Sequence, residues 1–187
     1  MIEPSRVSAV LVTKGDHDLS EIYDSIAAAG ITDVVTWDNS KSENLSCYGR
    51  YEGIKEARND WIYHQDDDLV APVAQILEAV DPIADRESIV ANNRADEPWL
   101  LTAMGVVFHR SLAESSFSAY VDLYGFDDDF CRVSDVIFAY QWSYRRIVLP
   151  YRDLAWAATD DRMHLQPDHY FVRERALARV RELTGFE

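Results

Sequence analysis

Three adjacent aspartates, Asp66–Asp68, close a short apolar run that begins at Trp61. Like charges placed side by side at the end of a buried strand cost free energy unless a cation relieves their repulsion. Carboxylate oxygens of this kind suit Mg²⁺ or Mn²⁺, and these ions usually also hold phosphate groups. The alternative is a solvated acidic loop, which is the more common role of a charge run.

The first 70 residues alternate between two periodic patterns. Residues 7–13, 31–37 and 61–64 are short apolar runs, as is typical of buried parallel strands. Between them, residues 19–26 and 48–58 carry apolar side chains at helical spacing. This alternation predicts right-handed βαβ units, and therefore an α/β fold with a central, mainly parallel twisted sheet and helices on both faces.

Polar side chains follow each of these three predicted strands. Thr13 closes the first strand, Asp38 follows the second, and Asp66–Asp68 follow the third. In open α/β sheets, ligands bind at the carboxyl ends of the strands. The sequence therefore predicts that these side chains meet at one binding rim.

The second half of the chain shows a less regular pattern. Gly105 interrupts an apolar segment, and Ser111 is expected to cap the helix that follows it. A second acidic cluster, Asp127–Asp129, precedes Ser134 and Asp135, which are expected to open an amphipathic helix. The further predicted elements are a helix at 72–80, strands at 87–91 and 101–108, a helix at 134–142, a strand at 146–149 and a helix at 170–183.

Length and composition narrow the class of protein. A chain of 187 residues, 48% of them hydrophobic, suits one globular domain over residues 1–187. A net charge of −15 disfavours nucleic acid and anionic lipid as partners unless a local basic groove exists. No apolar run reaches the ~18–20 residues that span a bilayer. The amino-terminal segment lacks signal-peptide features, so a cytoplasmic location is expected, with Cys47 and Cys131 as free thiols.

The order of these motifs resembles that of nucleotide-sugar-dependent glycosyltransferases of the GT-A fold, in particular family-2-like members. The resemblance covers roughly residues 7–170, with Gly105 in the acceptor-side strand. The segment Asn44–Tyr51 and the triple aspartate are also similar to exostosin-like members. The resemblance implies one GT-A domain with a nucleotide-binding half at about 7–70, an acceptor-side half at about 71–170 and a C-terminal helix at about 170–184.

The resemblance also implies roles for residues of the first half. Asp68 is the first candidate for a direct Mn²⁺ or Mg²⁺ ligand, and Asp66 for a water-mediated metal contact or a ribose contact. Asp67 is expected to point the other way, because side chains alternate along an extended segment. The remaining nucleotide-site candidates are Thr13, Asp38 as a hydrogen-bond acceptor from the base or a turn former, and Lys14 and Arg50 as diphosphate ligands or surface cations.

Two roles fall to the second half. Asp135 is the candidate base that deprotonates an acceptor hydroxyl, with Asp127, Asp128 and Asp129 as competitors; it also suits a plain helix N-terminal acid. A late histidine completes the metal site in many such enzymes, and here His169 is preferred to His164, although either also suits a capping role.

The implied reaction moves a sugar, a hexose by expectation, from a UDP-sugar or related donor to a hydroxyl acceptor. A nucleotidyltransferase is the alternative enzyme, but its glycine-rich phosphate loop is reduced here to Lys14–Asp16. A binding module without catalysis is the alternative outside enzymes. A small soluble compound, a cell-surface precursor and a hydroxylated base in phage-type DNA all stay open as acceptors, and so does the oligomeric state.

Overall fold

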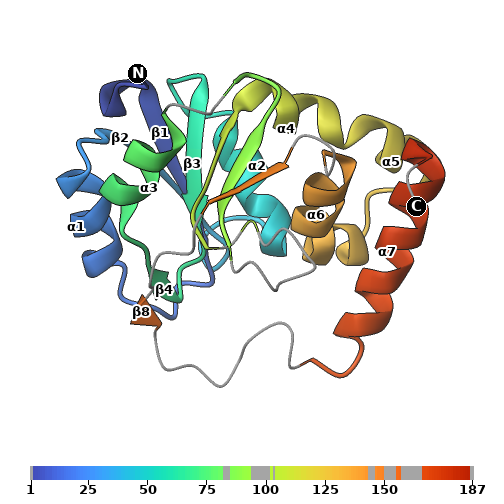
Figure 1. Cartoon of the computed structure of the whole chain (residues 1–187). Coiled ribbons are helices and arrows are strands. Elements are labelled where there is room, and N and C mark those ends of the chain that lie inside the picture. Colours follow the sequence, from blue (N-terminus) through green and yellow to red (C-terminus); the bar gives the residue numbers. More distant parts are fainter. Residues whose placement is uncertain are drawn as a thin grey trace.

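A computed structural model describes residues 2–81, 85–93, 102, 104–142, 146–149, 155–156 and 166–185. Its centre is a six-stranded sheet with the order β2-β1-β3-β6-β5-β7 (Figure 1). The strands are β1 (Val7–Thr13), β2 (Asp33–Asp38), β3 (Trp61–Gln65), β5 (Ile89–Asn92), β6 (Val106–His109) and β7 (Arg146–Leu149). A separate two-stranded sheet pairs β4 (Leu69–Val70) with β8 (Ala155–Trp156).

The sheet is mixed but mostly parallel, as the sequence pattern predicts. β1 pairs in parallel with both β2 and β3, and β5 pairs in parallel with β7. β6 is antiparallel to both of its neighbours, β3 and β5. The carboxyl ends of the five parallel strands therefore share one edge of the sheet, where β6 begins.

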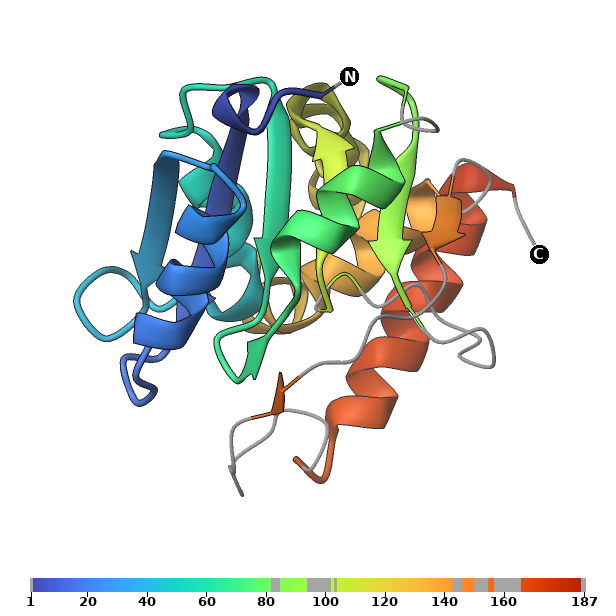
Figure 2. The ribbon, with the colours of Figure 1, turned by 60° about the vertical axis from the view of Figure 1, so that its left-hand side comes forward.

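Helices cover both faces of the sheet (Figures 1 and 2). α1 (Ser20–Ala28) and α3 (Val73–Val80) pack on one face, where they share a core with Ala9 and Leu11 of β1. The opposite face packs against a core that includes Val10. The helices of that core are α2 (Gly49–Ile54), α4 (Arg110–Ser116), α5 (Ser118–Tyr124), α6 (Asp128–Gln141) and α7 (His169–Thr184).

Several predicted boundaries were wrong, and the strand predicted at 101–108 begins only at Val106. The helical pattern of 48–58 resolves into a 3-10 turn, Ser46–Tyr48, followed by the short helix α2. The cap of α4 is His109, whose side chain accepts a hydrogen bond from the Ser111 backbone N–H, so Ser111 is not the cap. α6 begins at Asp128 and not at Ser134, because Asp127 caps its first turn. None of the described helices is long and apolar enough to cross a membrane.

Gly105 enters β6 with a backbone that favours glycine. Its φ is +94°, and a Cβ atom added there would lie 2.7 Å from Ile76 Cδ1. Gly125 has a similar φ of +89°, yet an added Cβ would meet nothing within 4 Å. An alanine at Gly125 would therefore meet backbone strain alone, whereas an alanine at Gly105 would meet both strain and crowding.

We expect Gly125→Ala to lower the free energy of unfolding by about 1–3 kcal/mol through strain alone. Gly105→Ala should cost about 1–3 kcal/mol more, because the new methyl group overpacks the core beside Ile76. Urea denaturation of the two variants and the parent protein measures both terms. Equal losses in the two variants would show that crowding at Gly105 contributes nothing.

Candidate functional site

The carboxyl ends of β1, β2 and β3 bring the predicted polar residues to one rim. Thr13 lies beside Asp38 in the register of β1 and β2, and Leu11 lies beside Gln65, the last residue of β3. Asp66 follows directly. These residues therefore line the edge of the sheet where ligands of α/β folds bind.

A buried ion pair ties α2 to this rim. Arg50 is 2% exposed, and its Nη2 donates to Asp66 Oδ1 over 2.6 Å. Gly49 makes this placement possible, because any Cβ at that position would overlap the Trp37 ring of β2. Arg50 Nε and Nη1 have no hydrogen-bond partner among the described residues. Two buried donors of the Arg50 guanidinium therefore lie beside Asp66, unpartnered within the described part of the chain.

Negative charge accumulates around this pair. Burial raises the pKa of Asp66 to about 6 despite the attraction of Arg50, and the neighbouring Asp68, Asp135 and Asp67 raise it further. The side chain is 33% exposed, so solvent reaches one side of the carboxyl group. An added cation would relieve this repulsion and favour the ionised form of Asp66.

Asp135 comes to the same site from α6. The helix has a non-helical residue, Val133 (φ −124°, ψ 19°), so Asp135 lies just after a break and near the start of the second helical segment. Its charge acts on Asp66 and on Arg50. It also helps to raise the pKa of the half-buried Cys47 thiol, for which desolvation is the larger cause. Nothing in the sequence around Cys47 indicates that it lies near this site.

The competing acidic residues have structural roles. Asp127 Oδ1 accepts from the Phe130 backbone N–H over 2.8 Å and so caps α6. Asp129 forms an ion pair with Arg175 of α7. Asp128 lies in the first turn of α6, where a carboxylate favours the positive end of the helix. Of the acidic residues in this region, Asp135 is the one whose charge acts on Asp66 and Arg50.

Hydrogen bonds to side chains hold the turns that follow β1 and β2. Asp38 accepts hydrogen bonds from Ser40 and from Lys41 Nζ, the latter over 2.6 Å, and these bonds, led by that of Lys41, lower the pKa of Asp38 to about 2. Thr13 Oγ1 accepts from the Gly15 backbone N–H over 2.9 Å. Lys14 is exposed. Asp38 therefore has the turn-forming contacts that were one of its two predicted roles, and it stays ionised at neutral pH.

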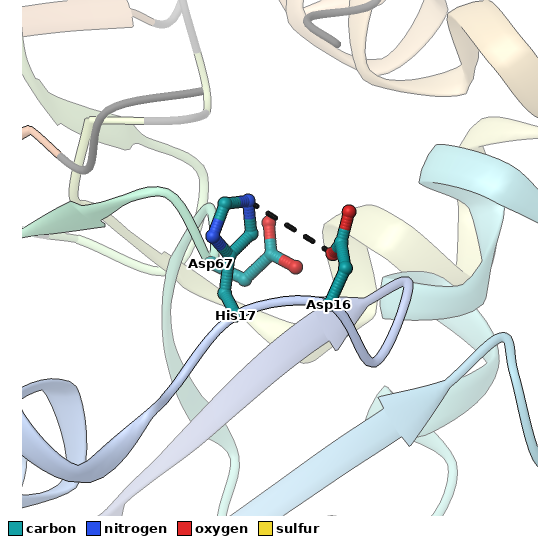
Figure 3. Close-up of side chains that lie close together, drawn as sticks. All are labelled: Asp16, His17 and Asp67. Atoms are coloured by element: carbon teal, nitrogen blue, oxygen red, sulfur yellow. Dashed lines mark ion pairs between the residues drawn. The ribbon is translucent and has the colours of Figure 1, made fainter. Parts of the chain in front are cut away.

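One group of three metal-type ligands occurs among the described residues: Asp16, His17 and Asp67 (Figure 3). Their ligand atoms all lie within 4.8 Å of one another, and Asp67 Oδ2 is buried with no hydrogen-bond partner in the described part of the chain. Asp67 thus lies toward the loop after β1, whereas Asp66 pairs with Arg50. Asp16 and His17 were missed, although their position directly after the first predicted strand places them at the rim.

Of the two histidines predicted as metal ligands, His169 lies within the described residues and His164 does not. His169 begins α7 and is 9% exposed, and it does not join any group of three metal-type ligands among residues 2–81, 85–93, 102, 104–142, 146–149, 155–156 and 166–185. His164 lies outside the described residues. Next to His169, Asp168 pairs with Arg132 of α6 at 2.9 Å. The preference for His169 as a metal ligand therefore stays a prediction.

No protein-family model matches the sequence, and no curated protein matches it. Solved structures do resemble this fold. S. aureus TarS 1-349 in complex with UDP is 15% identical with a TM-score of 0.58, over 94% of this chain and 65% of that one. The mannosyltransferase PcManGT from Pyrobaculum calidifontis, in complex with GDP-Man and Mn²⁺, is 15% identical with a TM-score of 0.60, over 99% and 66%. The chain has the GT-A fold.

A third GT-A structure supports the same assignment of fold. Glucosyl-3-phosphoglycerate synthase from Mycobacterium tuberculosis, in complex with Mn²⁺, UDP-glucose and phosphoglyceric acid, is 10% identical with a TM-score of 0.52, over 97% of this chain and 80% of that one. This chain spans about two thirds of the length of the TarS fragment and of the mannosyltransferase. At such identities the likeness establishes the GT-A fold alone.

The Arg50–Asp66 ion pair should contribute more to the free energy of unfolding than an exposed ion pair does. Arg50→Met should lower the free energy of unfolding by about 1.5–3 kcal/mol, because it leaves a mostly buried carboxylate without its cation. Lys55→Met breaks the pair with Glu52, in which the lysine is 67% exposed, and should cost at most about 1 kcal/mol.

Urea denaturation of Arg50→Met, Asp66→Asn and the double variant, without metal, measures the coupling between the two groups. The predicted coupling has a stabilising sign. Additive single losses, or a loss in Arg50→Met no larger than that in Lys55→Met, would contradict the role given to the pair.

Proposed function

We propose that this protein is a metal-dependent glycosyltransferase that moves a sugar from a nucleoside-diphosphate sugar to a hydroxyl acceptor. The observation that carries the proposal is the rim of the GT-A sheet, where the buried Arg50–Asp66 pair adjoins the carboxylates of Asp68 and Asp135. A UDP-sugar with a hexose is the first donor to test, since TarS and the mycobacterial synthase are solved with UDP or UDP-glucose.

The residues at the rim fit a divalent cation. Asp66 and Asp68 supply oxygen ligands, the type that Mn²⁺ and Mg²⁺ prefer, and the excess of negative charge around Asp66 favours a cation there. When bound, such an ion supplies positive charge for the diphosphate leaving group. His17 or His169 would add an imidazole, which Mn²⁺ accepts more readily than Mg²⁺.

Side chains of the protein would bind the nucleotide and accept the proton of the acceptor. Arg50 holds Asp66 in place and directs its unpartnered Nε and Nη1 donors to the bound nucleotide. Asp38, Thr13 and Lys14, at the ends of β1 and β2, face the nucleoside or the diphosphate. Asp135 accepts the proton of the acceptor hydroxyl as that oxygen attacks the anomeric carbon, and the nucleoside diphosphate leaves.

The acceptor is a hydroxyl compound of a class still to be identified. The net charge of −15 disfavours nucleic acid, so small soluble hydroxyl compounds come first in a screen. DNA with a hydroxylated base is tested separately in the acceptor screen, because phage-type DNA carries such acceptors. Release of free sugar from a nucleotide-sugar identifies the donor even before the acceptor is known.

Nucleoside diphosphate binding should require a divalent ion. Calorimetric titration of UDP and GDP with Mn²⁺ should show binding that EDTA abolishes, and Asp68→Asn should weaken the Mn²⁺-dependent binding by roughly 2–4 kcal/mol through loss of a charged contact. His17→Ala and His169→Ala, titrated in parallel, identify which imidazole joins the metal. Equal UDP affinity with Mn²⁺ and with EDTA would contradict the metal role.

Asp135→Asn should keep donor affinity and lose about 10²–10⁴-fold in transfer rate, because a general base acts on the chemical step. Asp127→Asn is the matched control: asparagine still caps α6, so transfer should be near normal. Rates with excess donor and calorimetric UDP affinities separate the two effects. Normal transfer by Asp135→Asn together with a large loss in Asp127→Asn would reverse the assignment.

A further inference from the structure

A cationic pocket lies at the edge of the sheet opposite to the carboxylate rim. It has a volume of about 130 Å³ and is lined by Arg6, Arg58, Asn59, Asp60, Trp61, Arg86 and His109. Three arginines against one carboxylate is an unusual lining for a chain whose net charge is −15. Such a concentration of positive charge in an acidic protein attracts anions selectively to this place.

Topology explains why these residues meet. Arg6, Asp60 and Arg86 precede β1, β3 and β5, whose amino ends share one edge because the three strands run in the same direction. His109 ends the antiparallel strand β6 at that edge, in register with Trp61. β3 has five residues and so spans roughly 16 Å, which keeps this pocket well separated from Asp66.

His109 lines this pocket and carries a buried nitrogen, Nε2. The residue is 8% exposed, and its Nε2 has no hydrogen-bond partner in the described residues. Its Nδ1 accepts from the backbone N–H of Ser111 and lies 2.8 Å from Ser111 Oγ, so the proton of the neutral ring is on Nε2. Burial, followed by the charge of Arg86, lowers the pKa of His109, which keeps the ring neutral at pH 7. A buried N–H without a partner is costly and is satisfied by a ligand acceptor.

The arginines of the pocket are largely available. Arg58 Nε lies 3.5 Å from Asp33 Oδ1. The Arg58 side chain is 87% exposed, so this ion pair is weak. Neither Arg6 nor Arg86 forms an ion pair within the described part of the chain. Guanidinium groups bind phosphate and carboxylate oxygens with two parallel hydrogen bonds, and a phosphate dianion carries twice the charge of a carboxylate.

We propose that this pocket, formed by Arg6, Arg58, Arg86 and the Nε2–H of His109, is a binding site for a small phosphate-type dianion. Inorganic phosphate or the terminal phosphate of a small metabolite carries the required chemistry. The site is independent of the proposed sugar transfer, because it lies at the other edge of the sheet and needs no metal. It gives the chain a second place at which phosphate compounds act.

Calorimetry of the full chain with inorganic phosphate and with pyrophosphate, at low ionic strength and with EDTA, tests the proposal. EDTA removes the divalent ion that the rim would need to hold a phosphate. Saturable binding is expected. Arg86→Gln and His109→Asn should each weaken it about tenfold or more, the effect of losing one charge-assisted or buried hydrogen bond. Asparagine keeps an acceptor for the α4 cap, so folding is preserved.

Arg181→Gln removes the same charge from the exposed end of α7 and is the matched control. It should bind phosphate as the parent does, and the His109 Nε2–H resonance should shift on phosphate addition in both proteins. Acetate should bind at least about tenfold more weakly than phosphate, since it offers one charge in place of two. Absent binding, equal weakening by Arg181→Gln, insensitivity to His109→Asn or equal affinity for acetate would each overturn the proposal.

Discussion

The repulsion among carboxylates at the rim governs the rest of the site. The charges of Asp68 and Asp135 act on Asp66 and help to raise its pKa, and Arg50 is the buried cation that opposes them. One guanidinium does not neutralise three carboxylates, and the pKa of Asp66 stays at about 6. A divalent ion would complete this charge balance, and an ion of that kind commonly also holds phosphate oxygens.

The fold delivers these charges from distant parts of the chain. The parallel pairing of β1 with β3 sets Asp66 at the sheet edge, and Gly49 lets α2 approach Trp37 closely enough for Arg50 to reach it. The break of α6 at Val133 places Asp135 near the start of a helical segment that faces the same rim. Small backbone features at residues without reactive groups therefore decide where the reactive groups lie.

Periodicity predicted the sheet because burial on both faces leaves continuous apolar runs such as residues 7–13, which form β1 with unchanged bounds. It failed where particular side-chain contacts, local or distant in the chain, decide the structure. The capping of α4 by His109 and the early start of α6 depend on local side-chain geometry. The Asp16–His17–Asp67 group depends on how the loop after β1 folds, and the arginine pocket joins segments that are far apart in sequence, so neither leaves a spacing signal.

Crystals grown with UDP and Mn²⁺ test the central claim most directly, because the anomalous signal of Mn²⁺ locates the ion without assumptions about its ligands. The account predicts one strong peak bound by Asp68 and the diphosphate, with the nucleoside along the ends of β1 and β2 and Arg50 still paired with Asp66. Manganese bound only by Asp16, His17 and Asp67, with no diphosphate at the rim, would contradict it.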